Sequence, residues 1–162
     1  MTEVSIKNDV PSPSSDLRIR AASAADVVEV YEIVEACQIR NLTQQHIKEE
    51  LSRAHVWLHV GKLNTSPCAQ AFLHAHYVVD QIEIIVLATH PSARRQGLAS
   101  ALLGRLIDSF RRSRFHGIYL EVRQSNVAAQ ELYSKFGFEV TGRRLRYYTD
   151  NDEDALLMSL PL

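Results

Sequence analysis

A glycine that follows two arginines marks a place in the chain where a phosphate group could bind. Residues 94–99 read Arg-Arg-Gln-Gly-Leu-Ala and lie between a strongly apolar run and a long helical pattern. The first turn of a helix leaves N–H donors without partners, and the helix dipole favours negative charge there. Gly97 lets the backbone approach a ligand closely, while Arg94 and Arg95 add positive charge for a pyrophosphate. Taken alone, these residues fit a phosphate-binding loop and an ordinary helix start equally well.

The elements that must position this loop form a mixed α/β pattern. The nearly continuous apolar run at residues 82–89 predicts a strand covered on both faces, and the stripe that begins at Leu98 predicts the long helix after it. Strands are expected at residues 17–20, 55–63, 69–79, 82–89, 118–122, 138–148 and 155–160. Helices are expected at residues 24–36, 43–53, 93–114 and 126–136.

The length of 162 residues fits one domain, which we place at residues 17–162. Residues 1–16 are polar and predict a disordered leader that lacks the apolar middle of a secretory signal, so the expected location is the cytoplasm. Cys37 and Cys68 lie far apart, which indicates neither a disulfide framework nor a zinc site.

Several function classes are excluded by what the sequence lacks. The glycine loop is not followed by Gly-Lys-Ser/Thr and contains no G-x-G-x-x-G, so neither a P-loop nor a dinucleotide fingerprint is present. The net charge of −1 gives no general attraction to nucleic acid or to an anionic membrane, and no apolar stretch is long enough to span a bilayer. We therefore expect neither a nucleic-acid partner nor a membrane partner.

Two weaker signals remain open. His74 and His76 alternate on one predicted strand and share a face, but a two-histidine metal site needs a third ligand and none has a suitable spacing, so no metal is expected. The cationic and aromatic run at residues 143–148 could grip a peptide, and a solvated strand face is an equally good interpretation.

Two motifs resemble a known family. The segment H-P-x-x-R-R-Q-G-L-A at residues 90–99 and the segment L-E-V-R-Q-S-N-x-A-A-x-x-L-Y-x-K-F-G-F at residues 120–138 are similar to the GCN5-related N-acetyltransferase (GNAT) superfamily. The second motif, with R-R-L-R-Y-Y and E-D-A-L-L-M near the end, resembles its RimI-like branch of ribosomal-protein alanine acetyltransferases. The resemblance implies a mixed α/β fold whose mostly antiparallel central sheet is splayed at the cofactor site, with flanking helices, and acetyl-CoA as the co-substrate.

The resemblance also implies roles for individual residues. The strand at residues 87–89 would bond the acetyl-pantetheine arm through its backbone, the glycine loop would hold the pyrophosphate, and Asn126 would touch the cofactor from the opposite side. Glu121 is implied as the base and Tyr133 as the acid. The full cofactor-binding set is Leu87, Ala88, Thr89, Arg94, Arg95, Gln96, Gly97, Leu98, Ala99, Ser100 and Asn126.

The chemistry of amine acetylation agrees with these roles. An α-amine with a pKa of about 8 loses its proton more readily than a lysine at about 10.4, and a carboxylate such as Glu121 can accept that proton. The N–H of Leu87 could stabilise the thioester oxygen, and Tyr133 could protonate the leaving sulfur. Because both cysteines lie outside the motifs, we expect direct attack in a ternary complex. Two structural alternatives stay open. Glu121 could form an ion pair with Arg123 or another cation, and Tyr133 could serve only to pack the core.

The predicted function is therefore transfer of an acetyl group from acetyl-CoA to a primary amine, with a protein N-terminus as acceptor. The RimI-like branch carries an F-P-W-S-like segment between its first two helices, whereas residues 37–43 here contain no aromatic side chain. A small amine such as a polyamine thus remains an alternative acceptor. A non-catalytic acyl-CoA-binding domain is a second alternative, against which the presence of both Glu121 and Tyr133 argues.

Overall fold

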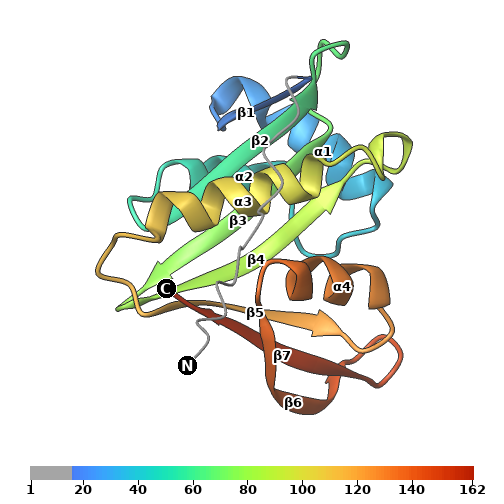
Figure 1. Cartoon of the computed structure of the whole chain (residues 1–162). Coiled ribbons are helices and arrows are strands. Elements are labelled where there is room, and N and C mark those ends of the chain that lie inside the picture. Colours follow the sequence, from blue (N-terminus) through green and yellow to red (C-terminus); the bar gives the residue numbers. More distant parts are fainter. Residues whose placement is uncertain (1–15) are drawn as a thin grey trace.

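The computed structural model describes residues 16–162, so all of the predicted leader except Asp16 lies outside the described residues. Seven strands form one sheet in the order β1-β2-β3-β4-β5-β7-β6 (Figure 1). The strands are β1 (Leu17–Ala21), β2 (Val56–Leu63), β3 (Ala71–Val78), β4 (Gln81–Thr89), β5 (Gly117–Arg123), β6 (Glu139–Tyr148) and β7 (Glu153–Pro161). All pairings are antiparallel except that of β4 with β5, so the predicted mixed α/β fold with a mostly antiparallel sheet is confirmed.

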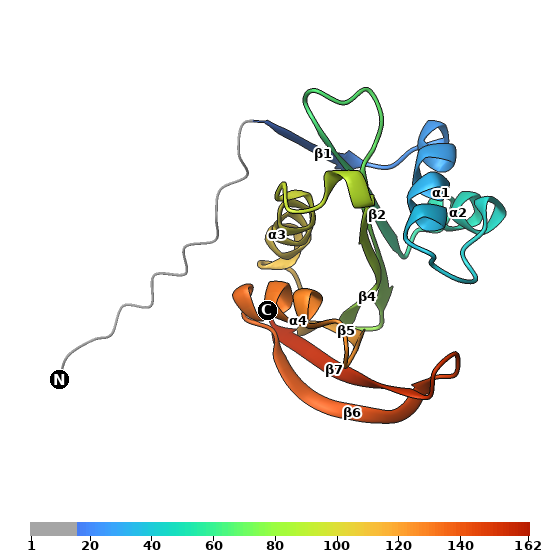
Figure 2. The same ribbon diagram turned by 90° about the vertical axis from the view of Figure 1, so that its right-hand side faces the viewer.

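The helices lie on both faces of this sheet, with α1 and α2 on one face and α3 and α4 on the other (Figure 2). They are α1 (Val27–Ala36), α2 (Gln44–Leu51), α3 (Leu98–Phe110) and α4 (Val127–Lys135), and short 3-10 turns precede α1 and α3 at Ala24–Asp26 and Pro91–Ala93. Within the described residues, no helix is long and apolar enough to cross a membrane.

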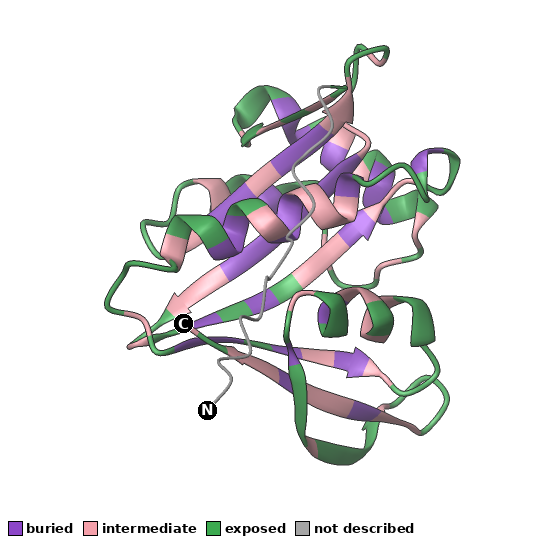
Figure 3. Cartoon of the chain, in the orientation of Figure 1, coloured by how far each residue is buried: buried purple, intermediate pink, exposed green. Residues whose placement is uncertain are grey.

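Each face of the sheet has its own apolar core. The core beneath α3 and α4 includes Leu102, Leu106 and Ile118, all fully buried, and the core beneath α1 and α2 includes Ile33 and Phe72. Figure 3 shows this burial along the central strands and on the sheet-facing side of α3. The sheet is therefore held from both sides, as the continuous apolar pattern of its middle strands predicts.

The start of the long helix differs from the prediction. The helix was expected from residue 93, but Pro91–Ala93 form a 3-10 turn and α3 begins only at Leu98. Arg95 and Gly97 have positive φ angles of 62° and 85°, which a right-handed helix does not tolerate. Residues 94–97 are thus a true loop, and the first amides of α3 lie directly after its glycine.

Candidate active site

The sheet opens between its two parallel strands. β4 and β5 pair from Gln81↔Gly117 to Ile84↔Leu120, and no later pair between them is found in the described part of the chain. A register shift in the β3–β4 ladder leaves Ile85 unpaired at this point, and a bulge of this kind bends its strand. Beyond it, β4 continues along β3 while β5 continues along β7 (Figure 1). We call this region, bordered by residues 85–89 and 121–123, the β4–β5 divergence.

Two residues of β4 turn their backbone groups toward the divergence. His90 donates its N–H to the carbonyl of Gln70 at 2.8 Å, which makes this an interstrand hydrogen-bonded pair. Because such pairs alternate along an antiparallel ladder, Ala88 bonds to β3, whereas Leu87 and Thr89 direct N–H and C=O away from β3. The backbone of Ala88 is therefore committed to the sheet, and only Leu87 and Thr89 can offer the backbone bonds predicted for residues 87–89.

Thr89 carries a further unused group. Its hydroxyl oxygen Oγ1 is buried and has no hydrogen-bond partner among the described residues. Its carbonyl, by contrast, accepts from the thiol of Cys37 at 3.3 Å and from Arg94 Nε at 3.4 Å. A buried hydroxyl without a partner is costly, so the end of β4 has the polar capacity to bind a ligand.

The glycine loop presents free amides beside this strand end. Gly97 is the residue before α3, and the first bond within the helix runs from Ala101 N–H to the carbonyl of Gly97 at 2.9 Å. The N–H groups of Leu98, Ala99 and Ser100 therefore have no partner inside the helix. The side chain of Leu98 is buried, so only its backbone can reach a ligand. Arg94, Arg95 and Gln96 are exposed around these amides, an arrangement suited to a pyrophosphate.

Glu121 is the first residue of β5 beyond the last β4–β5 pair. Leu120 and Val122 are buried beneath α3 and α4, so by strand alternation the side chain of Glu121 lies on the opposite face. Its Oε1 atom lies 3.0 Å from Arg144 Nη1, and a hydrogen bond to its carboxylate raises the pKa of Tyr147. The alternative ion pair with a cation is thus present, through Arg144 on β6. Arg123 instead pairs with Asp150 and Glu153.

Tyr133 lies on α4 in the core beneath α3 and α4, with its ring 5.6 Å from that of Phe138. It is 7% exposed, and burial raises its pKa to about 12, so the phenol is neutral at physiological pH. The ring therefore packs as the structural alternative supposes.

Tyr148, at the end of β6, connects the two predicted catalytic residues. Burial is the main cause of the raised pKa of both tyrosines; the charge of Tyr148 adds to the shift of Tyr133, and the charge of Glu121 adds to the shift of Tyr148. The guanidinium of Arg123 lies over its ring at 3.9 Å. The sequence identified Tyr148 only as part of a cationic and aromatic run, because its interaction with Glu121 depends on how β6 pairs with β7.

Asn126 has the structural role that competes with its predicted one. Its Oδ1 atom accepts from Ala129 N–H at 3.2 Å and so caps α4. It is exposed at the start of the helix that borders the divergence. The predicted contact of Asn126 with the cofactor remains a prediction.

The structure corrects the reasoning about His74 and His76. Glu50, on α2, places its Oε2 atom 2.9 Å from Nε2 of His74 and 2.6 Å from Nε2 of His76. The expectation that no third ligand accompanies these histidines is therefore wrong. Glu50 lies 24 residues before His74 in the sequence, and no local pattern connects them. Burial lowers the pKa of His74, which keeps its imidazole neutral.

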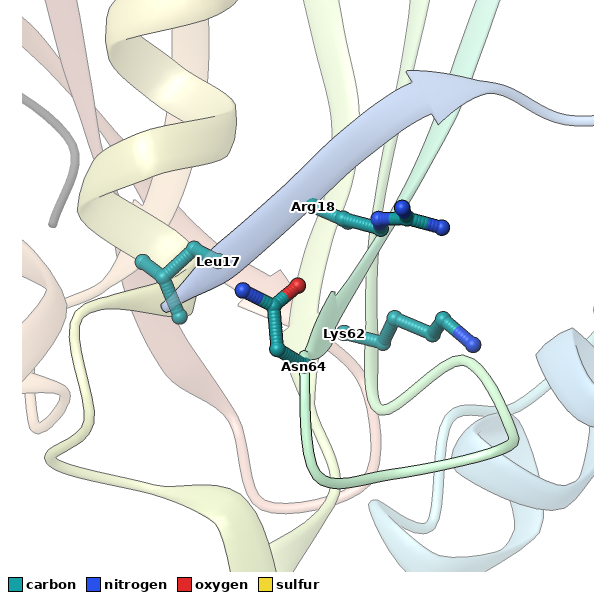
Figure 4. Close-up of a pocket in the computed structure, with 4 residues that line it drawn as sticks. All are labelled: Leu17, Arg18, Lys62 and Asn64. Atoms are coloured by element: carbon teal, nitrogen blue, oxygen red, sulfur yellow. The ribbon is translucent and has the colours of Figure 1, made fainter. Parts of the chain in front are cut away.

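A surface pocket lies elsewhere, at the edge formed by β1 and β2. Leu17, Arg18, Lys62 and Asn64 line it (Figure 4). None of the predicted site residues does so, although a Cβ atom placed on Gly97 would lie 3.7 Å from Leu17 Cδ1. The pocket therefore neighbours the glycine loop without containing any of the predicted chemistry.

Known proteins share sequence with this chain. A model of the acetyltransferase (GNAT) family matches residues 27–138. The [ribosomal protein bS18]-alanine N-acetyltransferase of Escherichia coli K12 is 42% identical over 94 residues, which cover 57% of this chain and 64% of that protein. A Bacillus subtilis protein provisionally named for the same activity is 31% identical over 140 residues, covering 86% and 92%. The matched segment thus spans less than two thirds of the E. coli relative.

The crystal structure of the ribosomal-protein-S18-alanine N-acetyltransferase from Escherichia coli superimposes on most of the chain. The TM-score is 0.80 with 29% sequence identity, and the match covers 90% of this chain and 93% of that one.

Proposed function

The chain belongs to the acetyltransferase (GNAT) family, and from that premise we propose that it transfers the acetyl group of acetyl-CoA to the α-amine of a protein N-terminus. The observation that carries the proposal is the β4–β5 divergence, which brings free strand amides and the free first-turn amides of α3 to one opening in the sheet. The similarity to enzymes named for alanine N-acetylation of a ribosomal protein favours an α-amine as acceptor. We also place the protein in the cytoplasm, where ribosomal proteins are made.

The proposed cofactor position follows from the donor groups. The pyrophosphate would lie on the amides of Leu98, Ala99 and Ser100, where the dipole of α3 favours its charge. The pantetheine arm would pass along β4 and use the outward backbone groups of Leu87 and Thr89. The partnerless hydroxyl of Thr89 supports this path, because a bound amide chain would supply a partner for it. Asn126 would contact the coenzyme from the α4 side.

Glu121 is proposed as the base, acting directly or through one water. The Arg144 side chain in its ion pair is 55% exposed, so incoming substrate can displace it. An acceptor amine near Glu121 would lose its proton as it attacks the thioester. The N–H of Leu87 would stabilise the negative charge that forms on the thioester oxygen.

Tyr133 is proposed to act on the leaving group. A phenol with a pKa of about 12 is a weaker acid than a thiol at about 8.5, so complete proton transfer to the thiolate is unfavourable. We therefore propose that the Tyr133 hydroxyl donates a hydrogen bond to the developing thiolate of coenzyme A. Final protonation would then come from solvent.

The test is release of free coenzyme A thiol when the protein is mixed with acetyl-CoA and an acceptor. A peptide that begins with alanine should be acetylated at its α-amine, and the same peptide with a blocked N-terminus should not react. Turnover of a polyamine but of no peptide would support the small-amine alternative. Tight binding of acetyl-CoA without turnover of any amine would support a non-catalytic binding domain.

The base is tested by Glu121→Gln, with Glu139→Gln as the matched control. Glu139 is an exposed carboxylate at the start of β6, where it pairs with Ser159 of β7. We expect Glu121→Gln to lower the turnover rate by about a hundredfold or more while the affinity for coenzyme A stays the same. Equal turnover in the two variants would remove Glu121 from the mechanism.

A further inference from the structure

Outside the proposed active site, three potential metal ligands meet between α2 and β3. His74 and His76 lie two and four residues after the buried Phe72, so all three share the face of β3 that packs toward α2. Glu50, on α2, extends one carboxylate oxygen between the two imidazole nitrogens. The three ligand atoms all lie within 4.8 Å of one another.

We propose that Glu50, His74 and His76 bind a divalent transition-metal ion of the zinc type and thereby clamp α2 to the sheet. Two imidazole nitrogens with one carboxylate oxygen are a ligand set that Zn²⁺ uses when a fourth position stays open. The site does not depend on the proposed acetyl transfer.

The separations are close to those that an ion requires. In a tetrahedral site with bonds of about 2.1 Å, the ligand atoms lie about 3.4 Å apart. Glu50 Oε2 is now 2.9 Å from Nε2 of His74 and 2.6 Å from Nε2 of His76, which are hydrogen-bond distances. Outward shifts of less than about 1 Å would therefore admit the ion in place of the bridging protons.

The surroundings also fit a metal site. The second oxygen of Glu50, Oε1, accepts from Arg53 Nη1 at 2.7 Å, which orients the carboxylate and leaves Oε2 for the ion. His74 is 5% exposed, whereas His76 is 25% exposed, so the site is anchored on one side and reachable from solvent on the other. The ring of His55 lies 5.6 Å from that of His76 and borders this open side.

The experiment is a titration of the chelator-treated, untagged full-length chain with ZnCl₂ by calorimetry, with Co²⁺ absorption spectra to report the coordination. We expect one ion per chain and a rise in melting temperature. The matched pair of variants is His76→Ala and His46→Ala, since His46 is an exposed histidine on the same helix as Glu50 and lies outside the cluster.

His76→Ala should weaken the affinity by about a hundredfold or more, and His46→Ala should leave it unchanged. Glu50→Gln, which keeps the size of the side chain, should weaken binding as His76→Ala does, and circular dichroism checks that all three variants fold. Failure of the wild-type chain to bind Zn²⁺ or Co²⁺ would overturn the proposal. So would binding that survives both His76→Ala and Glu50→Gln with the same affinity.

Discussion

Replacement of Gly97 by alanine separates the conformational role of this residue from its proposed role in binding. Gly97 has a φ angle of 85°, and a Cβ atom there would meet only Leu17 Cδ1, at an ordinary contact distance of 3.7 Å. The cost of Gly97→Ala in stability is therefore conformational, about 1–2 kcal/mol for a residue with a side chain in the left-handed region. We expect the added methyl group also to crowd a phosphate bound at the first-turn amides of α3, because it sits on the residue directly before them.

Gly137→Ala is the matched control. Gly137 has a φ angle of 90°, and its Cβ atom would lie 3.4 Å from Leu160 Cδ1, again in ordinary contact. Its conformational cost should be similar, but the position follows α4 and lies outside the glycine loop. Urea unfolding should show comparable losses of stability for the two variants.

Only Gly97→Ala should weaken the binding of coenzyme A. A charge-assisted hydrogen bond contributes about 1.5–3 kcal/mol, so the loss of one such bond predicts an affinity at least about tenfold lower by calorimetry. An unchanged affinity in Gly97→Ala, or an equal loss in Gly137→Ala, would refute the reasoning.

Three further predictions concern a catalytic side chain and two titrating groups. Tyr133→Phe should lower turnover about tenfold or more while the variant stays folded in urea unfolding, because the ring keeps its packing in the core; equal turnover would exclude the hydroxyl. Burial lowers the pKa of His59 to about 4, so the folded state disfavours its charged form. The free energy of unfolding, measured through Trp57 fluorescence, should therefore fall by about 2 kcal/mol from pH 7 to pH 5. His59→Gln should flatten this pH profile. Two hydrogen bonds from Arg20 help to lower the pKa of Asp26 to about 2. The stability that the ionised Asp26 contributes is present above pH 4 and lost as the pH falls toward 2. Asp26→Asn should cost about 2 kcal/mol at pH 7 in urea unfolding, and an unaltered unfolding midpoint would contradict the ion pair.

Much of the fold could be predicted because its signals are local. The apolar run at residues 82–89 forms β4 within one residue of its predicted start, and Thr43 and Asn126 cap α2 and α4 through their own side chains. The start of α3 was placed too early, since residues 93–96 have a helical composition. The positive φ angle of Arg95 delays the helix, and the sequence does not predict such an angle at a residue other than glycine.

The details of the site depend on tertiary structure that no local pattern encodes. The bulge at Ile85 decides that Leu87 and Thr89, and not Ala88, turn their backbone groups toward the divergence. The contact between Glu121 and Arg144 requires β7 to pair with both β5 and β6, and the meeting of Glu50 with the two histidines requires α2 to pack on the sheet face that carries them. In each case the residue types identified the candidate residue, but its partner lies on an element that is distant in the sequence.

The most direct test of the central claim is an NMR titration of the ¹⁵N-labelled protein with coenzyme A. We predict that the largest amide shifts fall on Leu98, Ala99 and Ser100 and on Leu87 and Thr89, the outward residues of β4. Absence of binding, or shifts confined to the pocket lined by Arg18 and Lys62, would contradict it.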